Sequence, residues 1–377
     1  MLLDLTERIK PNDVYLIAEI GQNHQGCLET AKKMILSAKK AGCSCVKFQK
    51  SDLKAKFTRT ALDRRYISDH AWGQTYGEHK EYLEFSKEQY RQLQAYSNEI
   101  EIDFTASAMD ESSLDFLVEL KVPFIKIGSG DANNFPLLKK AAGLNVPLII
   151  STGMQTMSTV DRIVEIMGQA SNNKYALMHC VSAYPTPPED CNLGLIRTLM
   201  RRFPNVLIGY SGHELGVIIT QAAILSGARI IERHFTLDKN QKGSDHRCSL
   251  DPNEMETLAR SIVEFKSKDY LSSPSLAPAE VISILGGGKD LSEALCESRA
   301  SEKYILECEL PCRLKLGKSI VASRNLLKGH IIQAADIAIK VSEPPGIFAE
   351  KYFEIINKQL TTNINEDDPI TEHVLSA

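Results

Sequence analysis

Two histidines occupy matching positions in two successive units of the sequence. His213 ends the segment Gly-Tyr-Ser-Gly-His, and His234 ends the segment Ile-Glu-Arg-His. Each follows a short apolar run of the kind that forms a buried parallel strand. Adjacent strands lie about 4.8 Å apart, so two imidazoles at one edge of a sheet can share a divalent cation. The pair predicts a metal site; the alternative is two unrelated polar residues in separate loops.

Three charged residues interrupt other apolar runs: Glu19, Lys47 and Lys126. Charged groups inside buried strands are costly unless they are paired or bind something. Two lysines and a glutamate that point into one cavity indicate an anionic ligand, with a phosphate or a carboxylate favoured. The alternative is a set of structural ion pairs that involve Glu19, Asp131 or Glu232.

Small residues and hydroxyl groups follow two of these runs. Gly128-Ser-Gly130 and Ser151-Thr-Gly153 supply turns that expose backbone N–H groups to an anion, although such turns follow strands in many proteins. Asp238, Asp245 and His246 follow the last run and are candidates for polyol binding or acid–base chemistry.

The elements that position these residues alternate along the first 270 residues. Apolar runs are separated by stretches of helical periodicity such as 28–41. The predicted strands span 14–20, 45–49, 102–107, 123–128, 146–151, 175–181, 206–210 and 229–234. Eight strands, each followed by a helix, predict an α/β fold of the (β/α)8 TIM-barrel type. A doubly wound sheet is the alternative, but no Gly-x-Gly-x-x-Gly follows the first strand.

The rest of the chain divides into three segments. Residues 51–86 form an unusually long connection that holds the only tryptophan and several basic residues, which predicts an ordered lid over the barrel mouth. After a barrel domain at 1–270, the Pro-, Ser- and Gly-rich residues 271–308 are expected to be a linker. Residues 309–377 are expected to form a small β-rich domain, which at that size needs something to dock on.

Composition limits the function classes. A net charge of −4 argues against nucleic acid as the main partner. No apolar run approaches the ~20 residues that span a bilayer, and the N-terminal residues reach charge too early for a signal peptide. Nine cysteines without a Cys-x-x-Cys pair indicate reduced thiols. We therefore expect a cytoplasmic enzyme.

A set of motifs runs along nearly the whole chain: Ala18-Glu-Ile-Gly-Gln-Asn-His-Gln-Gly26, Val46-Lys-Phe-Gln49, Ile125-Lys-Ile-Gly-Ser-Gly130, Ser151-Thr-Gly-Met154, Ala183-Tyr-Pro185, Gly209-Tyr-Ser-Gly-His213 and Glu232-Arg-His-Phe-Thr236. Together they resemble the sialic acid synthase family. The segments 72–79, 129–135 and 243–246 resemble its animal branch, and the tail resembles the family's antifreeze-like (SAF, β-clip) domain.

The resemblance implies an activity and a set of roles. The activity is condensation of phosphoenolpyruvate with N-acetylmannosamine 6-phosphate, which gives N-acetylneuraminate 9-phosphate and phosphate. It implies Mn²⁺ or Mg²⁺ on His213 and His234, and an acid–base or water-positioning role for Glu19. It also implies that phosphoenolpyruvate is held by Lys47, Lys126, Ser107, Ser129, Ser151 and Ser211, and the sugar by Gln49, Tyr184 and Asp245. The implied assembly is a domain-swapped homodimer in which each tail domain caps the partner's barrel mouth.

Three positions depart from the bacterial members of that family. Ser182 replaces an asparagine and Asp131 replaces a glutamate, as in the animal branch, so we expect Ser182 at the substrate and Asp131 in the catalytic group. The tail lacks an arginine that reaches the neighbouring subunit's sugar, and Lys340 is the candidate substitute.

Alternative functions stay open from the sequence. One is a related synthase that uses free N-acetylmannosamine or an unacylated sugar phosphate, and another is a non-catalytic carbohydrate-binding protein. If the sugar carries a phosphate, we expect basic residues of the lid to bind it. The candidates are Lys54, Lys56, Arg59, Arg64 and Arg65.

Overall fold

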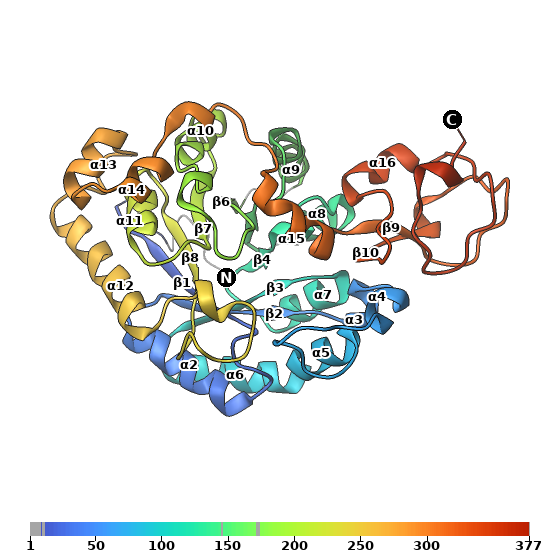
Figure 1. The fold of residues 1–377 in the computed structure, drawn as a ribbon, viewed down its shortest axis with the longest axis horizontal. Coiled ribbons are helices and arrows are strands. Elements are labelled where there is room, and N and C mark those ends of the chain that lie inside the picture. Colours follow the sequence, from blue (N-terminus) through green and yellow to red (C-terminus); the bar gives the residue numbers. More distant parts are fainter. Residues whose placement is uncertain (1–8, 10–11, 145, 171–173, 377) are drawn as a thin grey trace.

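Eight parallel strands close into a barrel in chain order, with helices around it (Figure 1). This computed structural model describes residues 9, 12–144, 146–170 and 174–376. The strands are β1 (Tyr15–Gly21), β2 (Cys45–Lys50), β3 (Asp103–Ala108), β4 (Ile125–Ile127), β5 (Leu148–Ser151), β6 (Tyr175–Cys180), β7 (Leu207–Gly212) and β8 (Ile230–His234). The predicted TIM barrel is confirmed. The expectation that the N-terminus is not a signal peptide concerns mainly residues 1–8, which lie outside the described residues.

A helix packs against the barrel after each strand. These helices are α2 (Leu28–Lys40), α6 (Lys87–Glu99), α7 (Glu111–Glu119), α8 (Phe135–Ala142), α9 (Met157–Gln169), α10 (Gly194–Arg202), α11 (Ile218–Leu225) and α12 (Pro252–Ser267). Helix α12 shows how the sequence sets its limits, because the Asp251 side chain caps the first turn and Pro252 occupies the first helical position. Its buried side chains recur at helical spacing: Met255, Leu258, Ile262 and Phe265.

The alternation of side chains along each strand decides what fills the barrel. An apolar layer closes the interior and includes Ile17, Cys45, Phe124, Ile149 and Ile230. Two residues further along the same five strands, the next inward layer consists of Glu19, Lys47, Lys126, Ser151 and Glu232. The polar layer therefore lies between an apolar plug and the barrel mouth, which is the end formed by the C-terminal ends of the strands.

The lid, residues 51–86, is ordered as predicted. It contains α3 (Leu53–Lys56), α4 (Arg59–Asp63) and α5 (Tyr76–Leu83). Its buried Phe57, Ala61 and Tyr76 form a small cluster with Val341 of the tail domain. The lid also reaches the loop after β8, where the backbone N–H of Gly243 donates to His70 at 3.0 Å.

The segment 271–308, expected to be a linker, contains two helices that pack on the barrel. They are α13 (Pro278–Leu285) and α14 (Lys289–Ala294). Val281, Leu291 and Leu295 of this segment are buried in the main hydrophobic cluster. The segment is therefore part of the barrel's outer layer, because its apolar side chains find a surface there.

The tail domain has a core of its own. It contains α15 (Leu310–Leu316), the antiparallel pair β9 (Ser319–Ala322) and β10 (Ile337–Lys340), and α16 (Tyr352–Ile355). Its apolar cluster includes Ile320, Leu326, Ile332 and Ile370. The tail lies beside its own barrel in Figure 1 and docks on the lid, where Val341 exchanges backbone hydrogen bonds with Lys56 and Thr58 at 2.8 and 3.0 Å.

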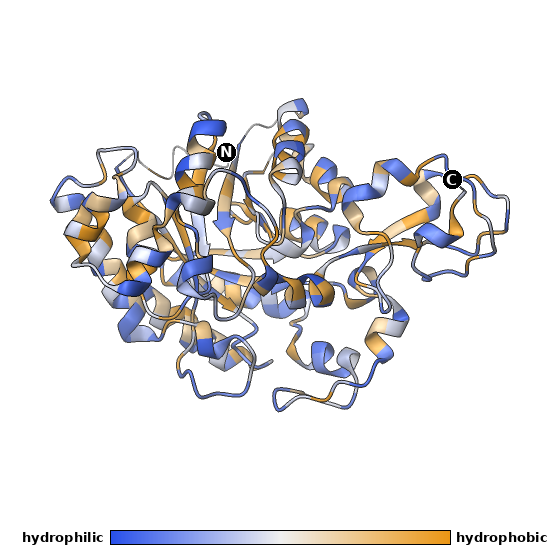
Figure 2. Ribbon diagram, turned by 45° about the horizontal axis from the view of Figure 1, so that its top comes forward, coloured by the Kyte–Doolittle hydropathy of each residue, from blue (hydrophilic) through white to orange (hydrophobic). Residues whose placement is uncertain are grey.

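Hydrophobic residues gather on the strands and on the inner sides of the helices, while hydrophilic residues line the outer sides (Figure 2). Among the residues that the structure describes, no helix has the length and hydrophobicity to cross a membrane.

Candidate active site

Strand register brings the charged residues to one level of the barrel. Glu19 on β1 lies opposite Lys47 on β2 and opposite His234 on β8. The Nζ of Lys47 lies 2.7 Å from Glu19 Oε2 and donates to Ser107 Oγ at 2.9 Å. The amide of Gln49 donates to the other Glu19 oxygen at 2.8 Å. The structure therefore brings together residues from the first, second, third and eighth strands.

Glu232, which the sequence analysis weighed only as a structural partner, joins the two lysines. One of its oxygens lies 3.6 Å from the Nζ of Lys47, and the other lies 3.5 Å from the Nζ of Lys126. Lys126 also donates to Ser151 Oγ at 2.6 Å, and Ser211 Oγ donates to Glu232 at 3.3 Å. Strand alternation was the signal for Glu232, because it lies two residues before His234 and so faces inward with it.

The pKa values of the two buried carboxyl groups are shifted in opposite directions. Burial raises the pKa of Glu19, and the negative charge of Glu232 adds to the shift although Lys47 opposes it. Burial acts in the same direction on Glu232, but the charges of Lys126 and Lys47 outweigh it and lower its pKa to about 2. The Glu232 carboxylate therefore stabilises the positive charges of both lysines, and Glu19 is the group better suited to take up a proton.

The two lysines also differ. Burial alone would lower the pKa of Lys47, but the charges of Glu19 and Glu232 overcome it and raise that pKa. Burial dominates at Lys126 and lowers its pKa, because the repulsion of Lys47 partly offsets the attraction of Glu232. A dianionic ligand beside Lys126 would stabilise its charged form.

The two histidines meet at the mouth, as their spacing predicted. Their ring centres lie 5.4 Å apart, and the ring of Tyr184 lies 4.1 Å from that of His213. The Nδ1 of His213 lies 2.8 Å from the carbonyl oxygen of Val181, a contact that fixes the ring orientation. The Nδ1 of His234 is buried without a hydrogen-bond partner in the described structure, and Asp245 Oδ2 lies 3.9 Å away.

Serine hydroxyl groups and a glycine line the opposite side of the mouth. The backbone N–H of Gly153 donates to Ser129 Oγ at 3.0 Å. A Cβ at Gly153 would lie 2.3 Å from Ser182 Oγ and 2.7 Å from Ser129 Oγ, so only glycine allows this approach. Cys180, at the end of β6, lies 3.5 Å from Ser129 Oγ and was missed by the sequence analysis, although strand alternation also turns it inward.

Two predicted site residues lie elsewhere. Asp131 is buried and forms an ion pair with Lys318 of the tail, so it ties the barrel to the tail domain. Lys340 lies on β10 and pairs with Asp367 of the same tail at 2.8 Å. Neither residue joins the cluster of Glu19, Lys47 and Lys126 within this chain.

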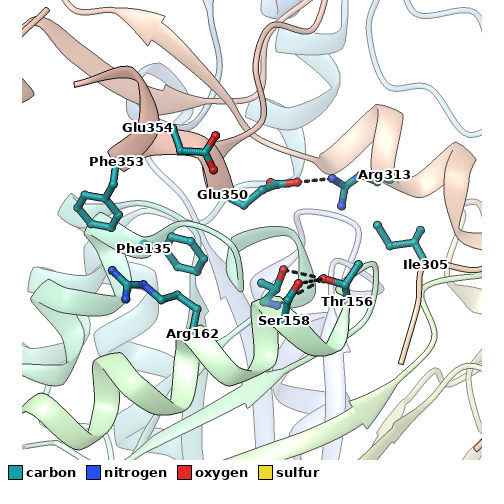
Figure 3. A pocket seen from close by; sticks show the side chains of 10 residues that line it. Phe135, Thr156, Ser158, Arg162, Ile305, Arg313, Glu350, Phe353 and Glu354 are labelled. Carbon is teal, nitrogen blue, oxygen red and sulfur yellow. Dashed lines mark hydrogen bonds and ion pairs between the residues drawn. The ribbon is translucent and has the colours of Figure 1, made fainter. Parts of the chain in front are cut away.

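A separate cavity of about 410 Å³ lies where α8 and α9 of the barrel face the tail (Figure 3). Arg313 donates to Glu350 across it at 2.5 Å, and the rings of Phe135 and Phe353 stack at its edge. Its lining contains none of the predicted site residues, so we assign it to the junction of the two domains.

The loop geometry behind the site depends on Arg233, whose side chain is completely buried on the face opposite Glu232 and His234. It donates to Glu214 Oε1 at 2.9 Å, to Gly216 O at 2.8 Å and to Thr220 Oγ1 at 2.6 Å. Replacing Arg233 with methionine is expected to lower the free energy of unfolding by about 3–5 kcal/mol, because Glu214 would remain buried without its partner. Urea denaturation measures this.

The matched control is Arg247→Met, which alters an exposed arginine in the loop after β8. That change is expected to stay within about 0.5 kcal/mol of the parent. A loss below about 1 kcal/mol for Arg233→Met would show that the Arg233–Glu214 pair does not stabilise the site.

Comparison with known proteins identifies the family. The family model of the NeuB family matches residues 34–269, and that of the SAF domain matches residues 317–375. The chain belongs to the NeuB family. Within the NeuB family it is 67% identical to N-acetylneuraminate-9-phosphate synthase of Drosophila melanogaster, over 98% of both chains. It is 46% identical to the human enzyme of the same name, over 96% of this chain and 92% of that one.

A solved structure extends the comparison to three dimensions. The spore coat polysaccharide biosynthesis protein SpsE of Bacillus subtilis matches with a TM-score of 0.76 and 28% identity, over 97% of this chain and 96% of that one. The two chains therefore share their fold over nearly the full length of each.

Proposed function

We propose that this NeuB-family chain condenses phosphoenolpyruvate with N-acetylmannosamine 6-phosphate, giving N-acetylneuraminate 9-phosphate and phosphate. The full-length similarity to synthases of that name in fly and human supports this assignment. The observation that carries it is a pair of buried lysines, Lys47 and Lys126, which share Glu232 beside the two histidines. A protein that only bound carbohydrate would have no need to bury such a charge cluster.

The reaction divides among the residues of the polar layer. Carbon 3 of phosphoenolpyruvate forms a bond to the aldehyde carbon of the open-chain sugar, whose oxygen takes a proton. Water then adds at carbon 2, and phosphate leaves as the bond between carbon 2 and oxygen breaks. Lys47 and Lys126, with Ser107 and Ser151, hold the anionic substrate and offset its charge.

Glu19 is the residue that moves a proton. Its raised pKa and its position beside Lys47 suit it to accept a proton from the attacking water. Gln49 holds the Glu19 carboxyl group in place through a 2.8 Å hydrogen bond. On the sugar side, Tyr184 and Asp245 flank the histidines and are proposed to contact the sugar.

A divalent cation, Mn²⁺ or Mg²⁺, is proposed to bind His213 and His234. The neighbouring rings, 5.4 Å apart, and the buried, unpartnered Nδ1 of His234 fit such an ion. Among the described residues no group of three histidine, cysteine or carboxylate side chains lies close enough to hold a metal, so water and substrate are expected to complete the coordination. When bound, the cation supplies positive charge next to the aldehyde oxygen.

We also propose a homodimer in which each tail domain covers the partner's barrel mouth. Lys340 lies away from the barrel site of its own chain, so a substrate contact from this position would have to come from a partner's tail. Light scattering should give twice the 41.9 kDa chain mass. A cytoplasmic location is proposed as well, because the buried Cys43, Cys180 and Cys248 are free thiols.

The test of the function is a phosphate-release assay. Phosphoenolpyruvate and Mn²⁺ are incubated with N-acetylmannosamine 6-phosphate, free N-acetylmannosamine, mannose 6-phosphate or arabinose 5-phosphate, each with and without EDTA. Release is expected to be fastest with N-acetylmannosamine 6-phosphate and to stop with EDTA. Faster release with arabinose 5-phosphate, or none with any sugar, would refute the assignment.

A further inference from the structure

Two lysines of the lid lack a carboxylate partner. Lys56 on α3 is buried, and its Nζ contacts the sulfur of Met109 at 2.8 Å. Lys80 on α5 donates to the side-chain oxygen of Gln22, in the loop after β1, at 2.9 Å. Throughout the described ranges, no carboxylate oxygen lies within 4 Å of either ammonium group. Shielded charges of this kind are costly unless an anion binds them.

Two neighbouring cations are already neutralised. Lys318 forms a buried ion pair with Asp131, and Arg64 pairs with Glu343 of the tail at 2.6 Å. These two pairs therefore hold the tail domain against the barrel and the lid, and among the described residues they leave Lys56 and Lys80 without a carboxylate within 4 Å.

Lys315, at the end of α15, adds a third such charge. Its Nζ lies 5.8 Å from the centre of the Tyr66 ring, and no carboxylate of the described residues comes within 4 Å of it. The crowding of cations is visible at Lys56, whose pKa is lowered to about 7 by burial and then by the charges of Lys80 and Lys318. An anion placed here would relieve that repulsion.

The hydroxyl group of Tyr76 provides an independent observation. Tyr76 is 1% exposed, and its hydroxyl is buried without a hydrogen-bond partner in the described structure. The guanidinium of Arg64 lies 4.4 Å and the Nζ of Lys80 lies 5.4 Å from the centre of its ring. A buried phenol that lacks an acceptor beside unpaired ammonium groups is the arrangement that a bound oxyanion completes.

The cluster borders the sugar side of the mouth. The lid contacts the loop after β8, where the backbone N–H of Gly243 donates to His70 at 3.0 Å. The same loop carries Asp245, whose carboxylate lies 3.9 Å from the Nδ1 of His234. The lid and the proposed aldehyde site therefore border one loop. In an open-chain hexose 6-phosphate, the phosphate is the group farthest from the aldehyde, so one substrate can reach both places.

We infer that Lys56, Lys80, Lys315 and the Tyr76 hydroxyl form a phosphomonoester subsite that binds the phosphate of the sugar substrate. The inference rests on the proposed function and narrows the five lid residues predicted from sequence. Lys54, Arg59 and Arg65 are exposed, and Arg64 is paired with Glu343. Of that set only Lys56 joins the subsite, while Lys80 and Lys315 were not predicted.

The test compares phosphorylated and free sugar in the same variants. Lys80→Met, Lys315→Met and Tyr76→Phe are each expected to lower the ratio of kcat/KM for N-acetylmannosamine 6-phosphate to that for free N-acetylmannosamine. The two lysine variants should lower it roughly 10- to 100-fold. A merely structural role would lower both kcat/KM values together and leave the ratio unchanged. Lys54→Met, an exposed lysine of the same lid, is the control and should leave the ratio as it is.

A titration separates this inference from the proposed function. Mannose 6-phosphate is titrated into the full-length protein without phosphoenolpyruvate, with mannose as the comparison, and is expected to bind at least tenfold more tightly. Equal affinity for the two sugars, or an unchanged kcat/KM ratio in the lysine variants, would overturn the subsite. If the parent protein releases no phosphate with any sugar, the proposed function fails, and the titration still decides the subsite.

Discussion

Replacing Lys126 with methionine is expected to lower kcat/KM for phosphoenolpyruvate by roughly 10²- to 10³-fold. Lys126 is 2% exposed and its ammonium group lies between Ser151 and Glu232, so the charge acts on an anion with little screening by water. Methionine keeps most of the buried aliphatic volume and removes the charge. Glu232 retains Lys47 at 3.6 Å, which limits the cost to folding. Steady-state phosphate release measures the effect.

Two comparisons make this result specific. Lys33→Met changes an exposed lysine of α2 and should leave kcat/KM unchanged. Thermal melting of Lys126→Met shows whether the barrel remains folded. A folded Lys126→Met protein with kcat/KM within about threefold of the parent would contradict the role of Lys126 in binding the anionic substrate.

The second large effect is expected at the histidine pair. Replacing His234 with alanine should lower kcat by about 10³-fold and abolish specific Mn²⁺ binding, because a metal held by two imidazoles cannot be retained by one. The structural basis is the 5.4 Å separation of the rings and the buried, unpartnered Nδ1 of His234. The electron paramagnetic resonance signal of free Mn²⁺ measures binding without reference to activity.

The control for this variant is His373→Ala, which removes an exposed histidine from the tail. It should bind Mn²⁺ and turn over substrate like the parent protein. If His234→Ala still sequesters one equivalent of Mn²⁺ with the parent's affinity, then the proposed metal site is misplaced, whatever happens to kcat.

The pattern of inward-facing residues was largely predictable from the sequence. The apolar runs marked eight strands, and their alternation placed Glu19, Lys47 and Lys126 in one layer. Glu232 and Cys180 obey the same alternation, but an acid after two isoleucines and a cysteine beside a histidine carry no distinctive motif. Only the closed barrel shows that Glu232 reaches both lysines.

The lid and the tail were less predictable for a physical reason. A strand fixes the direction of its side chains by its own periodicity, whereas a connection such as 51–86 takes its shape from the surfaces that it contacts. The burial of Lys56 depends on Met109 and on the tail, and Lys315 approaches Tyr66 only because α15 returns to the barrel. From the sequence alone, the five basic residues predicted in the lid were therefore equal candidates for binding the phosphate, although only Lys56 among them is buried.

Local periodicity and spacing in the sequence thus determined the barrel, the histidine pair and the lysines that face inward, because each follows from strand direction and neighbouring strands. The tertiary structure decided which charges are paired. It assigned Asp131 to Lys318 and Lys340 to Asp367, and it left Lys56, Lys80 and Lys315 without carboxylate partners among the residues it describes. Pairing depends on distances of a few ångströms between segments far apart in the chain, and only packing sets those distances.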